Sequence, residues 1–332
     1  MKDNTIRAKR QPIPRRAVTL KKLSWRGRGR NTLPWSIFDP SGGATFAPGG
    51  NSLYHDCSAM TAYLTPLLNR DRPGAYREFA QLEGRTRITR IGGYEIHSRE
   101  YGDGPEDVVL VHGLSGSSRW WERNIPALAE RYRVFIPDLI GFGRSPRPRG
   151  RLPSIDSLAG VLGEWIQRVG RAEAHVVGHS MGGQLAIHLA AAHPDQVTSL
   201  VLVDAAGIPR PLTPRTVVRF AREIAPVWRW GDLSFVPVIV SDAWTAGPRT
   251  LLQAIGHILS DDVRPLLPRI AAPTLILWGE KDTWVPLVHG RELRDRIPHS
   301  RLEILPRAAH NPMVDRPADF NRAVLRFLRD RD

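Results

Sequence analysis

Cysteine, long apolar runs and acidic charge are all scarce in this sequence of 332 residues. The single cysteine, Cys57, excludes an internal disulfide and fits a reducing compartment, so we predict a cytoplasmic protein. No apolar run approaches the roughly 20 residues that a transmembrane helix needs. Even the stretch 197–206 is interrupted by Asp204. We therefore expect no stable insertion into a membrane.

The shortage of acidic residues leaves a formal net charge of +14, which raises the question of a nucleic-acid partner. Residues 1–59 hold 11 Lys/Arg against 3 Asp, whereas the remaining residues hold 36 Lys/Arg against 30 Asp/Glu. Most of the excess thus lies in one Pro/Gly-rich segment without helical or strand periodicity, which we predict to be a disordered tail. We predict no nucleic-acid partner, because no binding motif accompanies the charge.

Three other interpretations of the basic tail stay open. Its Arg-rich, acid-poor composition resembles an organellar transit peptide, although serine is sparse and no amphipathic helix is visible. The tail would also serve as a nucleic-acid-binding arm. In the third interpretation the tail is not translated, and Met60 is the true start of the protein.

Strand and helix patterns alternate from residue 86 onward. An alternating hairpin over 86–91 and 94–98 is typical of an antiparallel sheet edge. Continuous apolar runs, expected of parallel strands covered on both faces, follow at 108–111, 134–136, 175–177, 200–203 and 274–277. Segments with helical spacing lie between or after them, at 158–169 and 320–328. The pattern predicts a doubly wound, mostly parallel α/β sheet over 86–332, with 60–85 as an N-terminal extension.

About 70 residues separate the run that ends at Val203 from the one that begins at Thr274, far more than an ordinary connection needs. We expect one helix from Thr213-Pro214 and another after Gly247-Pro248, with aromatic residues between them. We predict that residues 208–246 form a lid over the carboxyl edge of the sheet, where open α/β sheets bind ligands. Any one of these aromatics would serve equally as an anchor between lid and core.

The stretch Val-Val-Gly-His-Ser-Met-Gly-Gly at 176–183 joins an apolar run to an amphipathic one. Gly178, Ser180 and Gly182 match the G-x-S-x-G pattern of a strand–turn–helix elbow, which holds a serine in a strained, exposed turn. Glycine suits both flanking positions because neighbouring backbone passes close beneath the turn. The predicted strand before the motif and helix after it favour an elbow over a glycine-rich turn that only ends a strand.

A serine hydroxyl becomes a good nucleophile when a histidine accepts its proton and an acid fixes the tautomer of that histidine. An elbow predicts the chain order serine, acid, histidine. Asp282 follows the apolar run 274–277, and His310 follows the run 302–305. Ser180, Asp282 and His310 are therefore the candidate catalytic residues.

Other residues compete for these roles. Glu280 and Asp204 are alternative acids, and an N-cap for the following helix is the alternative role of Asp282. Four histidines near the elbow precede the acid in the chain, and we expect them to be packing or surface groups. They are His175, His179, His188 and His193.

An acyl-transfer intermediate also needs two backbone N–H groups that stabilise its oxyanion. One is expected from Met181, directly after the serine, and the other from the loop 111–116, with Leu114 as the candidate. His112 in the same loop is expected to be a structural brace.

The sequence resembles the α/β-hydrolase superfamily over residues 86–329. The matching blocks are His112-Gly113, Pro137-Asp138-Leu139-Ile140-Gly141-Phe142-Gly143-Arg144-Ser145, Gly178-His179-Ser180-Met181-Gly182-Gly183, Gly279-Glu280-Lys281-Asp282 and Ala309-His310-Asn311-Pro312. The resemblance implies that Ser180 is the nucleophile, His310 the base and Asp282 the orienting acid. It also implies that the loop containing Asp138 is structural.

The resemblance implies a serine hydrolase of the carboxylesterase or lipase type. Epoxide hydrolases and haloalkane dehalogenases carry aspartate where Ser180 stands, which disfavours both. We predict cleavage of a carboxylic ester or related acyl compound with a hydrophobic portion, through an acyl-enzyme, without cofactor or metal. A perhydrolase, a meta-cleavage carbon–carbon hydrolase or a non-catalytic ligand-binding protein on the same fold stays open, as does the oligomeric state.

Overall fold

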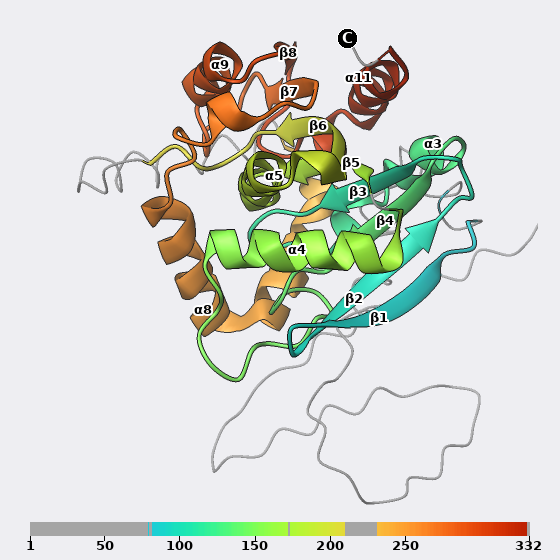
Figure 1. The fold of residues 1–332 in the computed structure, drawn as a ribbon, viewed down its shortest axis with the longest axis vertical. Coiled ribbons are helices and arrows are strands. Elements are labelled where there is room, and N and C mark those ends of the chain that lie inside the picture. Colours follow the sequence, from blue (N-terminus) through green and yellow to red (C-terminus); the bar gives the residue numbers. More distant parts are fainter. Residues whose placement is uncertain (1–78, 80–81, 172, 210–230, 331–332) are drawn as a thin grey trace, which may run out of the picture. The chain divides into compact units, whose positions relative to one another are not determined.

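The computed structural model of the protein describes residues 79, 82–171, 173–209 and 231–330 (Figure 1). The predicted tail 1–59 and most of the predicted extension 60–85 lie outside the described residues. So do the helix predicted at Thr213-Pro214 and residues 210–230 of the predicted lid.

The described part of the chain forms an eight-stranded sheet with the spatial order β1-β2-β4-β3-β5-β6-β7-β8 (Figure 1). The strands are β1 (Arg85–Ile91), β2 (Tyr94–Tyr101), β3 (Asp107–Val111), β4 (Arg133–Pro137), β5 (Ala174–His179), β6 (Val197–Val203), β7 (Thr274–Gly279) and β8 (Ser300–Leu305). β2 pairs antiparallel with β1 and β4, and the other neighbouring strands pair in parallel. This topology confirms the predicted mostly parallel α/β sheet with an antiparallel hairpin at its edge.

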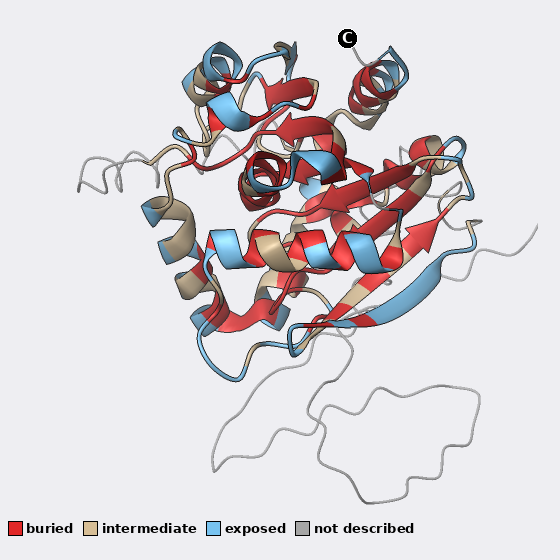
Figure 2. Ribbon diagram, viewed as in Figure 1, coloured by how far each residue is buried: buried red, intermediate tan, exposed pale blue. Residues whose placement is uncertain are grey.

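The central strands are buried on both faces, which explains their continuous apolar sequences. Successive side chains of a strand point to opposite faces, so Leu200 and Ile276 pack into one core while Val201 and Leu275 pack into the other. The edge strand β1 is mostly exposed, as its pale blue ribbon shows (Figure 2). Polar residues therefore appear in β1 at positions where the central strands carry valine and leucine.

Helices cover both faces of the sheet (Figure 1). One core contains residues of α4 (Ile155–Val169), α5 (Met181–Ala192) and α9 (Leu287–Arg296). The other contains residues of α3 (Ile125–Ala129), α10 (Pro312–Asp315) and α11 (Pro317–Asp330). Short 3-10 turns are η1 (Ser118–Trp121), η2 (Pro194–Gln196), η3 (Leu233–Phe235) and η4 (Leu267–Arg269). No helix among the described residues combines the length and apolar character that crossing a bilayer would require.

The second predicted helix of the long insertion is present after Gly247-Pro248. It is the second segment of α8 (Val236–Ser260), whose first segment, before Gly247, was not predicted. Gly247 has φ 74° and ψ 159°, which only glycine adopts readily, and Pro248 suits the first turn of the continuing segment. The sequence signal for a helix start thus marks the point where the second helical segment of α8 begins, after the kink at Gly247.

Candidate active site

Ser180 lies on the sharp turn between β5 and α5. Its φ of 52° and ψ of −116° place a non-glycine residue in a strained backbone region, and its side chain is nearly buried. A Cβ atom at Gly178 would lie 2.4 Å from the carbonyl oxygen of Gly182, and one at Gly182 would lie 2.3 Å from that of Val111. Glycine at both positions is therefore a steric requirement of the turn.

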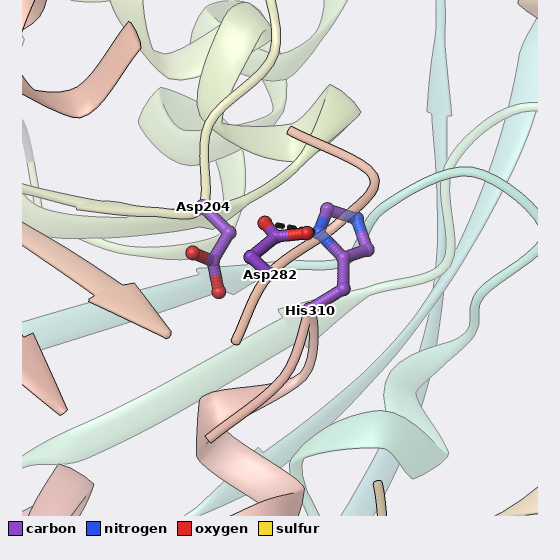
Figure 3. A group of neighbouring side chains, drawn as sticks. All are labelled: Asp204, Asp282 and His310. Carbon is purple, nitrogen blue, oxygen red and sulfur yellow. Dashed lines mark hydrogen bonds and ion pairs between the residues drawn. The ribbon is translucent and has the colours of Figure 1, made fainter. Parts of the chain in front are cut away.

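The structure brings together the three side chains that the sequence singled out. The Nε2 atom of His310 lies 3.2 Å from the Oγ atom of Ser180. On the other side of the ring, Nδ1 lies 2.8 Å from Oδ2 of Asp282 (Figure 3). Oδ1 of Asp282 accepts the N–H groups of Trp284 and Val285, at 2.7 and 3.1 Å. Asp282 is thus fixed by its own loop and aligned with the imidazole.

The loops that carry Asp282 and His310 are joined by backbone contacts. The N–H of Lys281 donates to the carbonyl of Ala308 at 2.8 Å. A Cβ atom at Gly279 would lie 2.0 Å from the carbonyl oxygen of Ala309, so these loops touch without room for a side chain. Both loops follow neighbouring parallel strands, β7 and β8. The sheet therefore fixes the positions of Asp282 and His310 relative to each other.

The two residues predicted to supply oxyanion donors belong to segments next to Ser180. Met181 is the first residue of α5, where the N–H groups of a helix lack intrahelical acceptors. Leu114 follows Gly113, at which a Cβ atom would lie 3.0 Å from Cβ of Ser180. His112 bonds through Nδ1 to the carbonyl of Gly113 at 2.8 Å, and its Nε2 accepts the N–H of Leu139 at 3.0 Å. It braces the loop in the neutral state, because burial lowers its pKa.

His179 lies inside the site, although its sequence position suggested a packing or surface role. Its Nε2–H donates to the backbone carbonyl of His310 at 2.7 Å, and the two rings are 4.9 Å apart. Burial and the neighbouring His310 lower the pKa of His179 well below its usual value, so the ring stays neutral. The side chain next to the serine therefore holds the backbone of the candidate base.

Aromatic side chains surround the histidine pair. Trp284 stacks on His310 with ring centroids 6.1 Å apart, and Trp120 lies 5.7 Å from His179. Phe235, at the entrance of α8, packs edge-on against Trp120 at 5.4 Å. The surroundings of the hydroxyl and imidazole are therefore largely apolar on this side.

A buried carboxyl attaches α8 to the rest of the site. Oδ2 of Asp242 accepts the Oγ–H of Ser117 at 2.7 Å and the indole N–H of Trp120 at 3.0 Å, and Arg119 lies 3.7 Å from Oδ1. Burial raises the pKa of Asp242 to about 6. Ser117 and Trp120 belong to the segment after the loop 111–116, so Asp242 joins that segment to the predicted lid.

A second buried carboxyl attaches the histidine loop. Asp315 accepts the N–H of Ala309 at 2.9 Å through Oδ2 and that of Asp232 at 3.0 Å through Oδ1. Burial raises its pKa to about 6 as well. Asp315 thus connects the residue before His310 to the chain that leads into η3.

Among the described residues, one group of three has ligand atoms close enough together to hold a metal ion, and it overlaps the candidate triad. One oxygen of Asp204, one oxygen of Asp282 and one ring nitrogen of His310 lie within 4.8 Å of one another (Figure 3). Both ring nitrogens of His310 already have partners, Asp282 and Ser180. A metal ion here would have to displace one of them.

The model of a family described as the alpha/beta hydrolase family matches residues 108–323. The chain belongs to this family. Within it, a putative carbamate hydrolase RutD of Stutzerimonas stutzeri is 30% identical over 257 residues, covering 71% of this chain and 96% of the relative. A 2-hydroxy-6-oxo-6-phenylhexa-2,4-dienoate hydrolase of Burkholderia cepacia is 28% identical over 270 residues, covering 72% and 92%.

Solved structures of alpha/beta hydrolases share the fold. A membrane phospholipase A matches with a TM-score of 0.65 at 26% identity, covering 84% of this chain and 93% of its own. A serine hydrolase involved in carbazole degradation, the CarC enzyme, matches with a TM-score of 0.63 at 26% identity, covering 74% and 99%. The family assignment made from the sequence blocks is confirmed.

The sequence prediction missed two contributions to the site. His179 was set aside because it precedes the acid in the chain, yet its contact is with the backbone of His310. Trp284 carries no motif of its own, but it lies two residues after Asp282 and stacks on the imidazole. Proximity in sequence to Ser180 and Asp282 was the available signal for both.

Proposed function

We propose that this alpha/beta hydrolase is a serine hydrolase that cleaves a carboxylic ester or related acyl compound with a hydrophobic portion through an acyl-enzyme. One observation carries the proposal: the continuous line from Ser180 Oγ to His310 Nε2, and from His310 Nδ1 to Asp282. In this role His310 takes the serine proton as Oγ attacks the carbonyl carbon, and Asp282 stabilises the imidazolium. The N–H groups of Met181 and Leu114 stabilise the tetrahedral oxyanion.

The apolar side chains around the site support the proposal that part of the substrate is hydrophobic. Trp120, Phe235 and Trp284 pack around His179 and His310, and Asp242 of α8 accepts a hydrogen bond from Trp120. We propose that residues 208–246, which include the first part of α8, act as a lid on this side. Aromatic and aliphatic walls stabilise a bound apolar group by removing its surface from water, worth about 25 cal/mol for each Å². We expect longer acyl chains to lower KM more than they change kcat.

A fluorophosphonate probe tests the mechanism directly. The unmodified protein is expected to become labelled at Ser180 and to cleave p-nitrophenyl esters. Ser180→Ala is expected to lose both, with a drop in kcat of about 10⁴-fold or more. Ser157→Ala, at an exposed serine on α4, is the matched control and should behave like the unmodified protein. Ester turnover that persists in Ser180→Ala would refute the assignment.

Carbon–carbon bond hydrolysis is the second candidate, supported by the Burkholderia relative whose name denotes a dienoate hydrolase. Carbamate cleavage is a third acyl chemistry, supported by the RutD relative. All three begin with attack or proton transfer at a carbonyl group beside Ser180. Comparing kcat/KM for a short-chain ester, a carbamate and a vinylogous diketone on the same preparation would rank them. We expect the ester to be turned over best.

A further inference from the structure

Asp204 is a buried carboxyl next to the candidate triad that the proposed mechanism leaves without a role. It follows β6, between the strand that leads to Ser180 and the strand that leads to Asp282, and its side chain is fully buried. Figure 3 shows Asp204 and His310 on opposite sides of Asp282, and one carboxyl oxygen of Asp204 lies within 4.8 Å of one of Asp282. The N–H of Asp204 donates to the carbonyl of Leu277 at 3.0 Å, which fixes its backbone to β7.

The two oxygens of Asp204 have different surroundings. Oδ1 accepts the N–H of Gly279 at 2.9 Å. Oδ2 is buried and has no hydrogen-bond donor among the described residues. A buried carboxylate oxygen without a donor is costly. A proton on this oxygen removes the cost, because the resulting hydroxyl can donate to the adjacent Asp282.

Asp282, unlike Asp204, has hydrogen-bond partners on both carboxyl oxygens. Its oxygens receive the N–H groups of Trp284 and Val285 and face Nδ1 of His310. Three donors on one carboxyl stabilise its ionised form. Two carboxylates this close cannot both be ionised in a buried site, so the single negative charge belongs on Asp282.

The electrostatics of Asp204 agree with this division. Burial raises the pKa of Asp204 well above its usual range, and the charges of Asp282 and Asp315 raise it further. The N–H of Gly279 acts in the other direction but does not overcome these effects. These effects favour the protonated form of Asp204.

We propose that Asp204 is a positioning residue which, in its protonated form, donates a hydrogen bond from Oδ2 to the carboxylate of Asp282 while Oδ1 holds the N–H of Gly279. The inference rests on the proposed serine-hydrolase function of the same site. Asp204 in this role orients Asp282 toward His310 without placing a second negative charge beside the imidazole. It also joins the ends of β6 and β7 at the base of the acid loop.

Asp204→Asn tests the protonation state. An asparagine amide donates to Asp282 through its NH₂ group and accepts from Gly279 through its carbonyl, as the protonated acid does. We expect kcat/KM for an ester within about tenfold of the unmodified protein and the acid limb of its pH profile within about 0.3 pH unit. The exposed Asp195→Asn is the matched control.

Two results would overturn the proposal. If Asp204 were ionised, removing its charge would destabilise the imidazolium and move the acid limb to lower pH by about one unit or more. If Asp204 were itself the orienting acid, Asp204→Asn would lower kcat by about 10⁴-fold, as expected when the acid of a triad becomes an amide. A loss of more than about tenfold therefore contradicts the proposed role.

Asp204→Leu tests the positioning role, because leucine can neither donate to Asp282 nor accept from Gly279. We expect a fall in kcat of about tenfold to a hundredfold with little change in KM. A kcat equal to that of the unmodified protein would refute positioning. If this variant does not fold, Asp204→Asn and the infrared measurement below decide the matter.

Infrared spectroscopy reads the proton without using activity. At about pH 8, where Asp242 and Asp315 with pKa values of about 6 are ionised, the unmodified protein should show the carbonyl band of a buried protonated carboxylic acid. The band should be missing from Asp204→Asn and present in Asp195→Asn. Its presence in all three proteins, or its absence from all, would refute the proposal. This readout stays decisive even if the unmodified protein neither labels with fluorophosphonate nor cleaves esters, which would count against the proposed function alone.

Discussion

Two buried histidines hold loops of this site in place through hydrogen bonds to the backbone. His112 and His179 are both neutral and buried, and each bonds to the backbone of a loop that carries a candidate functional group. His112 braces the loop 111–116, and His179 braces the loop of His310. His179 thus positions the histidine proposed to transfer the proton, and His112 positions the loop proposed to supply an oxyanion donor.

His179→Phe is expected to lower kcat of ester cleavage by about tenfold with a small change in KM. Phenylalanine fills a similar volume but cannot donate to the carbonyl of His310, which leaves that buried carbonyl unpaired and its loop less fixed. Steady-state kinetics with a p-nitrophenyl ester measure the effect. An unchanged kcat would show that the contact does not position the base.

Gly182→Ala is expected to destabilise the protein by more than about 2 kcal/mol and to abolish ester cleavage. The added methyl group would lie 2.3 Å from the carbonyl oxygen of Val111, so the elbow must move. Gly160→Ala on α4 is the matched control, because its methyl group meets nothing within 4 Å and should stabilise the helix by about 0.5–1 kcal/mol. Urea denaturation measures both, and equal effects would contradict the steric explanation.

At the scale of elements, the attachment of α8 is the feature with a built-in pH dependence. Its one buried carboxyl among the described residues, Asp242, takes hydrogen bonds from Ser117 and Trp120 of the preceding loop and η1. The kink at Gly247 lies five residues further along the same helix. The helix is therefore anchored on the site side just before it changes direction.

We expect the unmodified protein to lose stability as pH rises through the pKa of Asp242, and Asp242→Asn to lack this loss. The folded pKa of about 6 lies above the usual 3.8, so the folded state binds the proton more tightly. This group's contribution is fully present below about pH 3.8 and is lost as pH rises through about 6. The loss amounts to roughly 2 pKa units, on the order of 3 kcal/mol.

Urea denaturation of both proteins at about pH 4.5 and pH 7.5 tests this expectation. The difference in unfolding free energy, variant minus unmodified, should become more favourable to the variant at the higher pH. Asp195→Asn, at an exposed acid, should follow the unmodified protein at both values. Parallel pH dependences of Asp242→Asn and the unmodified protein would show that Asp242 does not titrate in this range.

At the scale of the whole molecule, four neighbouring parallel strands each lead to one residue of the polar group. Ser180 follows β5, Asp204 follows β6, Asp282 lies in the loop after β7, and His310 lies in the loop after β8. The carboxyl ends of parallel strands meet at one edge of the sheet, which is where open α/β sheets place ligands. The sheet, packed between two cores, is thus the frame that sets the distances between these residues.

Substitutions in the two cores are expected to act independently. Ile166→Ala on α4 and Leu328→Ala on α11 each remove a nearly fully buried side chain and should cost about 2–5 kcal/mol. The two side chains pack on opposite faces of the sheet, so the double variant should equal the sum within about 0.5 kcal/mol. Chemical denaturation of the unmodified protein, the two single variants and the double variant gives the double-mutant cycle. A larger coupling energy would show that the sheet transmits strain between its faces.

The sequence by itself determined the order of strands and helices, the family, and the identities of Ser180, Asp282 and His310 as candidates. Each of these depends on local information. Continuous apolar runs identify strands covered on both faces, and glycine is required where backbone leaves no room for Cβ. The motif at 178–182 predicted the elbow because a side chain at either flanking glycine would clash with nearby backbone. The clash of Gly178 is within the turn itself, and that of Gly182 is with the adjacent β3.

Only the tertiary structure decided what depends on contacts between distant segments. The partner of His179 is 131 positions away in the chain, and the charge that faces Asp204 comes from a loop after the next strand. The helix predicted after Gly247-Pro248 is present, but the helical segment that precedes Gly247 in α8 was not predicted. A carboxyl that is unremarkable in the sequence becomes a buried acid once folding removes its water and brings a second carboxyl beside it.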